Sequence, residues 1–223
     1  LADILDVPKE EIASMRTAKI MGEFTKGFYF LKQYGKAATF FGSSREKKEC
    51  PSYEEAEQLA QQLSDIGFTV ITGGGPGIME AANKGAKEAG GTSVGLNIEL
   101  PSGQRINEYV TSAESFHYFF ARKVMLAFAS EVYIFFPGGF GTLDEFFELV
   151  MLVQTKRIAP IPIILVDQEY WSPLLSWIEK TLYGKYNTVS KEDMEIYHLV
   201  DNAKEAMELI RKMVKRADRV GKK

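Results

Sequence analysis

The run VYIFFPGGFGTLDEFFELVMLVQ, at residues 132–154, predicts one complete unit of strand, loop and helix. Its apolar start at 132–136 is typical of a strand that is covered on both faces. A glycine-rich loop follows at 137–142, and the residues after it read as a helix to about Gln154. Glycines let a backbone approach a ligand closely, and the helix start offers unpaired N–H groups. The run therefore predicts a strand of a parallel sheet with an anion site at its carboxyl end.

The same order of elements recurs on both sides of this run. Apolar, strand-like stretches at 37–41, 68–72, 92–97 and 161–166 alternate with longer amphipathic stretches. This alternation predicts an α/β fold with a Rossmann-like, doubly wound parallel sheet flanked by helices on both faces. Further helices are expected at 8–33, 51–67, 78–89, 116–129, 171–182 and 202–217, and a long loop is expected at 98–114.

Length and composition indicate a single domain. The chain has 223 residues, of which 45% are hydrophobic and 26% are charged, as in ordinary soluble globular proteins. We expect an N-terminal helical extension at 1–36, one Rossmann-like nucleotide-binding domain at 37–217 and a basic tail at 218–223.

Charge and cysteine content exclude several classes of protein. A net charge of −3, from 27 Lys and Arg against 30 Asp and Glu, argues against a protein that coats nucleic acid. The only cysteine, Cys50, excludes an intramolecular disulfide framework and fits a reducing compartment. No apolar stretch approaches the roughly 20 residues of a membrane span, and no signal-peptide pattern is visible. We therefore expect a cytoplasmic protein that binds neither membranes nor nucleic acid.

Two glycine loops at strand ends favour a phosphate-bearing ligand over mere turns. The second loop is Gly73-Gly74-Gly75-Pro76-Gly77, and the first strand ends in Gly42-Ser43-Ser44. No P-loop sequence is present. The dinucleotide fingerprint needs a further glycine where this chain has Ile78 in one loop and Asp144 in the other, so NAD is disfavoured. A mononucleotide or a sugar phosphate fits two separate anion loops better.

Charged residues near the loops are the candidates for chemistry. Asp144 and Glu145 begin the helix after the PGGFGT loop, where carboxylates either complement the helix dipole or lie near the sugar of a bound nucleotide. Arg122 and Lys123 are adjacent cations on an apolar helix, and a structural salt bridge would explain them as well as a substrate contact. No cluster has the spacing of metal ligands, so we expect no metal and no other cofactor.

Together these motifs resemble those of the LOG (LONELY GUY) family, formerly labelled "possible lysine decarboxylase". The stretch PGGFGTLDE at 137–145 matches the family motif PGGxGTxxE, and Arg122-Lys123 matches its Arg-Lys pair at a similar spacing. GGGPGIME at 73–80 is similar to the second glycine loop of bacterial members. The resemblance covers roughly residues 37–183. No pyridoxal phosphate signature supports the decarboxylase label.

The resemblance implies a phosphoribohydrolase that cleaves the N-glycosidic bond of nucleoside 5′-monophosphates. In the cytokinin-activating type, the substrates are adenosine 5′-monophosphates that are modified at N6. It implies Arg122 and Glu145 as the catalytic pair, since a carboxylate can stabilise an oxocarbenium-like sugar and orient water. It also implies a set of substrate-binding residues: Gly42, Ser43, Gly74, Gly75, Gly77, Gln104, Lys123, Gly138, Gly139, Phe140, Gly141 and Thr142.

Partners and alternatives also follow from the resemblance. It implies a homodimer or a higher even homo-oligomer, for which Phe116, Phe119, Phe120 and Phe147 are candidate interface residues, although core burial would explain them equally. The alternative function is a non-catalytic nucleotide or molybdenum-cofactor carrier, which has no evident need for the Arg122 and Glu145 pair. The residues before that pair, Phe119-Phe120-Ala121, differ from those of plant members, so the base preference stays open.

Overall fold

The computed structural model describes residues 9–99 and 106–220, with side chains described for 14–99 and 106–214. Seven parallel strands form one sheet in the order β4-β3-β2-β1-β5-β6-β7. This order confirms the Rossmann-like, doubly wound α/β fold. The strands are β1 (Ala37–Phe41), β2 (Thr69–Thr72), β3 (Ser93–Ile98), β4 (Ser112–Phe116), β5 (Val132–Phe135), β6 (Ile163–Val166) and β7 (Tyr197–Val200).

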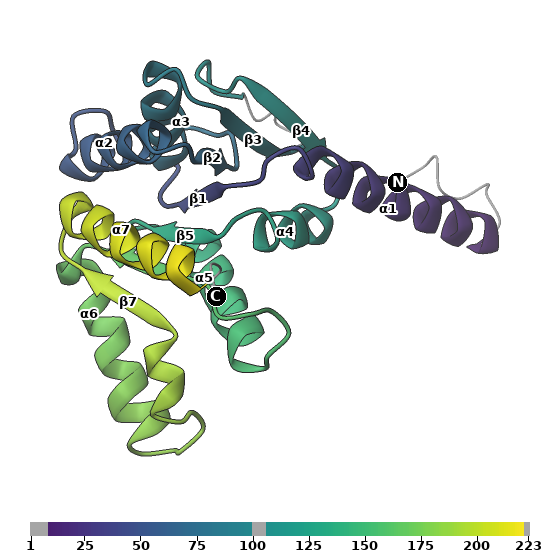
Figure 1. Cartoon of the computed structure of the whole chain (residues 1–223). Helices are drawn as coiled ribbons and strands as arrows, with labels where there is room; N and C mark the ends of the chain where they lie inside the picture. Colours follow the sequence, from purple (N-terminus) through teal and green to yellow (C-terminus); the bar gives the residue numbers. More distant parts are fainter. Residues whose placement is uncertain (1–8, 100–105, 221–223) are drawn as a thin grey trace.

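Helices cover both faces of this sheet (Figure 1). Alternate residues of a strand point to opposite faces, so Ala38 and Phe40 of β1 join one core while Ala37 and Phe41 join the other. Helices α2, α3 and α7 pack over the first core, and α1, α4, α5 and α6 pack over the second. The helices are α1 (Lys9–Leu31), α2 (Pro51–Asp65), α3 (Ile78–Glu88), α4 (Phe119–Ala127), α5 (Phe140–Gln154), α6 (Gln168–Trp177) and α7 (Ala203–Val220).

Helix α1 projects beyond the sheet, and its second half packs against α4 (Figure 1). Gly27 lets it approach α4, because a Cβ at this position would collide with Met125. The Glu23 carboxylate accepts the N–H groups of His117 and Tyr118 at 2.9 and 3.1 Å, just before α4 begins. These contacts tie the predicted N-terminal extension to the helix that carries Arg122.

Two edge strands and one helix boundary differ from the sequence prediction. The expected loop at 98–114 contains the start of β4, whose polar sequence SAESF lacks the continuous apolar signal of a central strand. Phe116 belongs to this strand and is buried in the core, so it is not an interface residue, and α4 begins only at Phe119. Strand β7, at the other edge, was not predicted at all.

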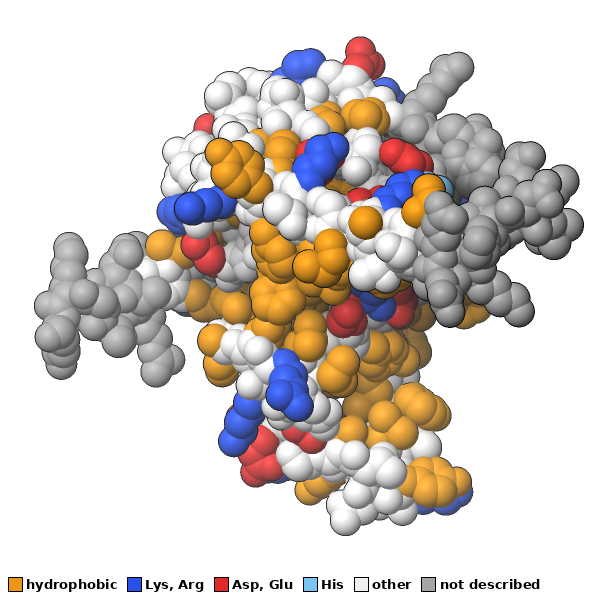
Figure 2. Space-filling model, turned by 90° about the vertical axis from the view of Figure 1, so that its right-hand side faces the viewer, with side chains coloured by type: hydrophobic (Ala, Val, Ile, Leu, Met, Phe, Trp, Pro, Cys, Tyr) orange, Lys and Arg blue, Asp and Glu red, His pale blue; other side chains and the backbone are white. Residues whose placement is uncertain are grey.

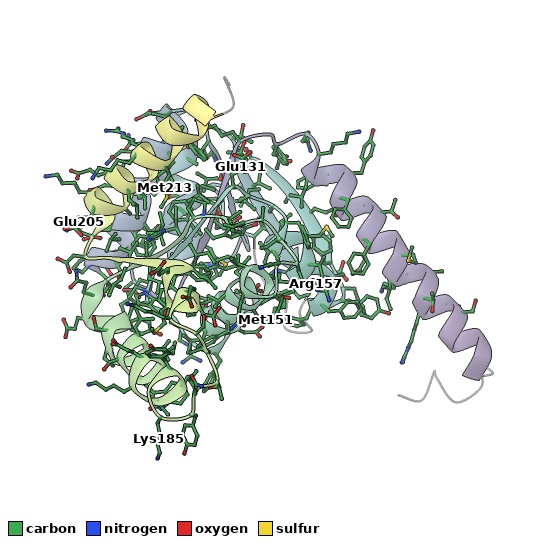
Figure 3. All side chains as sticks on the ribbon, turned by 60° about the horizontal axis from the view of Figure 1, so that its bottom comes forward. Glu131, Met151, Arg157, Lys185, Glu205 and Met213 are labelled. Carbon is green, nitrogen blue, oxygen red and sulfur yellow. The ribbon has the colours of Figure 1, made fainter. Side chains whose placement is uncertain are left out.

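The helix expected at 171–182 also differs, because it is two elements. Helix α6 continues as a π-helix at Ile178–Tyr183. The two helices form a projection that extends away from the sheet, and Lys185 lies at its tip (Figure 3). No helix in the described parts of the chain has both the length and the apolar character that a membrane crossing requires.

The close contact between α2 and α3 predicts that one added methyl group, at Gly85, lowers the stability of the protein. Gly85 of α3 faces the backbone of α2, and a Cβ there would collide with the carbonyl oxygen of Glu57. A clash with backbone atoms cannot be relieved by a change of side-chain rotamer, and such overpacking costs about 1–3 kcal/mol. We expect Gly85→Ala to lower the free energy of unfolding by that amount in urea titrations. Gly22→Ala is the matched control, since Gly22 lies in α1 with no atom near its missing Cβ, and an equal loss in both variants would contradict the prediction.

Candidate active site

The candidate site lies where the order of the sheet reverses, between β1 and β5. The chain adds β2, β3 and β4 on one side of β1 and β5, β6 and β7 on the other, and doubly wound proteins bind ligands at such a switch point. The loops after β1 and β5 are joined there by a hydrogen bond from Ser43 N–H to Pro137 O, 2.9 Å long. The cleft beside them has a volume of about 270 Å³. It is lined by Phe41, Gly42, Ser44, Gly73, Met79, Phe119, Arg122, Leu126, Gly141, Thr142, Asp144 and Glu145.

The loop after β5 presents the start of α5 to this cleft. Gly139 caps the helix without a side-chain hydrogen bond, which leaves first-turn amides for an anionic ligand. Thr142 is buried directly under the loop, where a Cβ on Gly138 would collide with its hydroxyl oxygen. From α6, the Tyr170 hydroxyl donates to Gly138 O at 2.5 Å. The packing of Gly138 on Thr142 and the hydrogen bond from Tyr170 thus hold this loop in place.

Arg122 enters the cleft from α4 and rests on two backbone segments. Its Nε donates to Leu96 O, near the end of β3, at 2.8 Å. Its guanidinium lies against Gly73, so a Cβ on Gly73 would collide with Nη2. Burial lowers the pKa of Arg122 and the charge of Glu145 raises it, with burial dominant; the side chain nevertheless stays cationic at neutral pH.

Glu145, in the first part of α5, faces Arg122 across the cleft and is hard to ionise. Burial raises its pKa from 4.5 to about 8, and the neighbouring charge of Glu148 acts in the same direction. The charges of Lys123 and Arg122 oppose this rise without cancelling it. Glu145 Oε2 is buried and has no hydrogen-bond partner among the described residues. The site therefore contains a carboxyl group that lines the cleft and has one buried oxygen without a hydrogen-bond partner among the described residues.

Lys123 takes a different place from its neighbour Arg122. Its Nζ lies 2.7 Å from Asp144 Oδ2 and 3.4 Å from Glu148 Oε2, so it pairs with carboxylates of α5. Burial lowers the pKa of Lys123, but its hydrogen bond to Asp144 and the nearby carboxylates outweigh this and raise the pKa overall. In this structure Lys123 is part of an ion-pair network at the edge of the cleft.

The structure brings together only some of the predicted site residues. Gly42, Arg122, Gly141, Thr142 and Glu145 line the cleft. Ser43, Gly138 and Gly139 belong to the two loops that border it, and the exposed Phe140 is the first residue of α5. Gly74, Gly75 and Gly77 do not line it, and Gln104 lies outside the described residues.

The second glycine loop packs inside the protein. Gly74 is pressed against Asn97 and Gly95, and Gly77 approaches the backbone of Ser43 so closely that neither position has room for a Cβ. Only Gly73 of this loop reaches the cleft, a residue that the sequence reasoning passed over. Ser44 and Met79 were also missed, although each lies two residues after a glycine that follows a strand. Asn97 had no signal in the sequence; its carboxamide is buried without a partner among the described residues.

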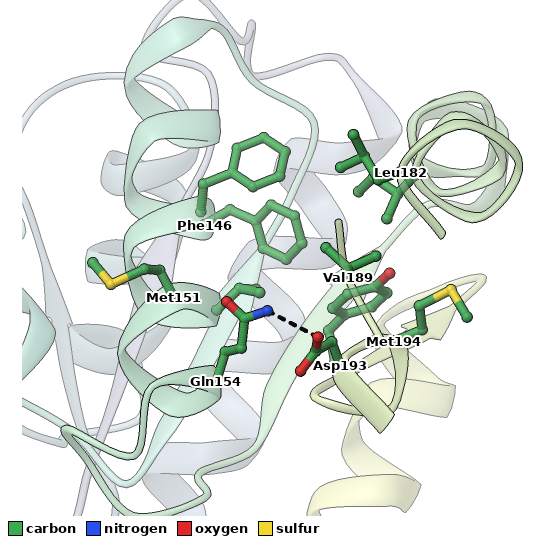
Figure 4. Close-up of a pocket in the computed structure, with 11 residues that line it drawn as sticks. Phe146, Met151, Gln154, Leu182, Val189, Asp193 and Met194 are labelled. Carbon is green, nitrogen blue, oxygen red and sulfur yellow. Dashed lines mark hydrogen bonds between the residues drawn. The ribbon is translucent and has the colours of Figure 1, made fainter. Parts of the chain in front are cut away.

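A second, apolar pocket lies on the opposite side of α5 (Figure 4). Phe146, Met151 and Leu182 are among its walls, and a hydrogen bond of 2.8 Å joins Gln154 to Asp193 at its edge. It has about 240 Å³ of space, and none of its lining residues is a Lys or Arg that could pair with a phosphate. The switch-point cleft is therefore the better candidate for a phosphorylated ligand.

Fold and cleft define a Rossmann-like α/β protein with a glycine-bordered site at its switch point. A family model described as "Possible lysine decarboxylase" matches residues 79–210. The chain belongs to this family, the LOG family.

Individual relatives agree with this membership. "Cytokinin riboside 5′-monophosphate phosphoribohydrolase LOG5" of Arabidopsis thaliana is 30% identical over 81% of this chain and 78% of its own length. The "Cytokinin riboside 5′-monophosphate phosphoribohydrolase" of Rhodococcoides fascians is 30% identical over 56% of this chain and 64% of its own length. Among solved structures, the molybdenum cofactor binding protein of Rippkaea orientalis has the same fold, with a TM-score of 0.60, 23% identity, and coverage of 81% of this chain and 98% of its own.

The raised pKa of Glu145 predicts how stability depends on pH. The native state binds more protons than the unfolded chain between about pH 4.5 and pH 8, so the free energy of unfolding falls as pH rises through this window. Glu145→Gln removes this loss. We expect the variant to match the wild type near pH 5 and to exceed it by roughly 2–4 kcal/mol near pH 9, in urea titrations.

The control for that experiment is Glu131→Gln, an equal change of charge at the exposed residue just before β5 (Figure 3). It should leave the pH dependence of the wild type unchanged. A constant difference between Glu145→Gln and the wild type across the pH range would show that Glu145 ionises as freely in the native protein as in the unfolded chain.

Proposed function

We propose that this protein hydrolyses the N-glycosidic bond of nucleoside 5′-monophosphates, releasing the free base and ribose 5-phosphate. The observation that carries the proposal is the buried Glu145 carboxyl group beside Arg122, at a cleft bordered by a glycine loop and a helix start. The names of the relatives from Arabidopsis thaliana and Rhodococcoides fascians support a cytokinin riboside 5′-monophosphate as one substrate.

In this proposal the loop after β5 holds the 5′-phosphate. Backbone N–H groups at the start of α5 and the Thr142 hydroxyl are the donors, and the helix dipole favours the negative charge. Because Tyr170 and the packing of Gly138 on Thr142 fix the loop, little ordering is left to occur on binding. The ribose then lies over the cleft between Glu145 and Arg122.

Glu145 acts on the sugar. The C1′–N bond breaks with its electron pair leaving on the base, so positive charge develops on the ribose ring, and the ionised Glu145 stabilises it. The carboxylate, which lines the cleft, also orients the attacking water, whose oxygen bonds to C1′. One water proton goes to the departing base and the hydroxyl stays on the ribose. Arg122 contributes a fixed positive charge, which anchors the ribose hydroxyls or the leaving base.

Product analysis tests this proposal. The purified chain is incubated with AMP, GMP, CMP, UMP and N6-isopentenyl-AMP, and base and ribose 5-phosphate are separated by chromatography. We expect turnover of at least one nucleotide, with kcat/KM lowered about 100-fold or more in Arg122→Ala and in Glu145→Gln. Because kcat/KM reports groups of the free enzyme, it should rise with pH, reach half of its maximum near pH 8 and level off about one pH unit higher.

Glu131→Gln again serves as the matched control and should keep wild-type activity. Glu145→Gln with wild-type rates would refute the role of its carboxylate. Tight nucleotide or cofactor binding with no turnover of any nucleotide would favour a non-catalytic carrier; the structural neighbour from Rippkaea orientalis is named a molybdenum cofactor binding protein.

We also propose that the chain forms a homodimer through an aromatic face on α1 and α4. Phe28, Phe119, Phe120 and Phe128 have 47–63% of their surface exposed. Ring contacts of Phe24 with Phe120 and of Phe28 with Phe128, at 6.3 and 6.4 Å between centroids, join the two helices into one face. A broad hydrophobic band covers this side of the molecule (Figure 2). Apolar patches of this kind mark protein interfaces more often than free surface.

Light scattering coupled to gel filtration tests the dimer. We expect the wild type to elute with twice the mass of one chain and Phe128→Asp to elute as a monomer, because a buried unpaired carboxylate opposes association. Tyr186→Asp, on the exposed projection after α6, is the control and should stay dimeric. A monomeric wild type at micromolar concentration would contradict the proposal.

A further inference from the structure

The second glycine loop is held at three backbone groups by side chains outside it. Thr72 Oγ1 accepts the Gly74 N–H at 2.8 Å. The Asn107 N–H donates to Gly74 O at 2.9 Å, and Asn107 Nδ2 donates to Gly75 O at 2.9 Å. Gly74 has a φ of +71°, a conformation that glycine adopts freely but that needs neighbours to hold it. The loop is therefore clamped, although it does not line the cleft beyond Gly73.

Asn83 of α3 joins the two clamps into one network. Its Oδ1 accepts the Thr72 hydroxyl at 2.6 Å and Asn107 Nδ2 at 3.0 Å, and its Nδ2 donates to Ser93 Oγ at 2.8 Å. Thr72, Asn83 and Ser93 have no exposed surface. Buried polar networks rigidify a structure when each member is satisfied, and they are costly when one partner is removed.

This network ends under the guanidinium of Arg122. Gly73 lies between Thr72 and the clamped Gly74, and it is the residue against which Arg122 Nη2 packs. The other support of Arg122, Leu96 O, belongs to β3 and is held by the ladder of the sheet. The glycine loop has no such ladder. Its position depends on Thr72 and Asn107.

We propose that Thr72, through its two hydrogen bonds, positions the glycine loop against Arg122 and so sets how strongly Arg122 acts on Glu145. Thr72 is a positioning residue, because it is buried and does not line the cleft. Its consequence for catalysis rests on the proposed function, whereas its consequence for the ionisation of Glu145 does not.

Several charged groups face Glu145, and only one of them depends on the loop. Arg122 and Lys123 approach from α4, Asp144 and Glu148 lie on α5 itself, and the Tyr133 hydroxyl lies on β5. Lys123, Asp144 and Glu148 hold one another by ion pairs that do not involve the loop. If the loop loosens, Arg122 alone moves away, and the ionised form of Glu145 loses stabilisation.

The experiment compares Thr72→Val, which keeps the shape and removes the hydroxyl, with Thr72→Ser, which keeps the hydroxyl. The ionisation midpoint of Glu145 is obtained from the pH dependence of the free energy of unfolding, each variant being measured with and without Glu145→Gln. We expect the midpoint to rise by about half a pH unit or more in Thr72→Val and to stay at the wild-type value in Thr72→Ser. With the nucleotide that the wild type hydrolyses best, kcat/KM at neutral pH should fall about 10- to 100-fold in Thr72→Val only.

Gly85→Ala is the structural control, since it disturbs the packing of α3 on α2 and removes none of the hydrogen bonds of Thr72. An unchanged midpoint in Thr72→Val, together with a loss of stability like that of Gly85→Ala, would overturn the proposal. If Thr72→Val does not fold, Asn107→Ala removes the other side-chain clamp from a half-buried position, and an unchanged midpoint there overturns it equally. Absence of nucleotide hydrolysis in the wild type would refute the proposed function alone, because the midpoint is measured from unfolding.

Discussion

The hydrogen bond from Ser43 N–H to Pro137 O marks the constraint on which the site depends. It joins the ends of β1 and β5, the only neighbouring strands in the sheet between which the chain reverses its direction of growth. Loops from such strands leave to opposite faces and cannot fill the gap between them, so a crevice forms there. The loop after β5 and Glu145 of α5 lie at this crossing, and Arg122 reaches it from α4.

Within that crevice, burial and charge are balanced against each other. Arg122 is desolvated and lines the cleft, and its side chain donates one hydrogen bond, to Leu96 O, among the residues that the structure describes. Glu145 is desolvated with an oxygen that no described residue satisfies. Groups left in this state cost stability. Beside them, Lys123 pairs with Asp144 and Glu148, so the cleft combines an ion-pair network with the unpartnered oxygen of Glu145.

The central strands and the loop at 137–142 could be predicted because each shows its signal locally, as an apolar run or as glycines before a helix. The edge strands could not. Strand β4 contains a buried carboxylate, Glu114, which pairs with Lys26 from distant α1 and accepts the Ser115 N–H. The roles of Gly74, Gly75 and Gly77 were equally hidden. A glycine in the sequence does not show whether the space beside it is for a ligand or for the protein itself. Here Gly74 makes room for the side chain of Asn97, and Gly77 makes room for the backbone of Ser43.

The same balance of charge bears on the choice between enzyme and carrier. A protein that only holds a phosphorylated ligand gains nothing from a carboxylate beside the anion loop, since like charges oppose binding. An enzyme gains when the carboxylate meets positive charge that exists only in the transition state, because this stabilisation is absent from the bound substrate. The dianionic phosphate also favours the protonated form of Glu145, so Arg122 is needed to keep enough of it ionised. The Arg122 and Glu145 pair is thus more useful together than either residue alone, and that interdependence is what a glycosidic hydrolase requires and a carrier does not.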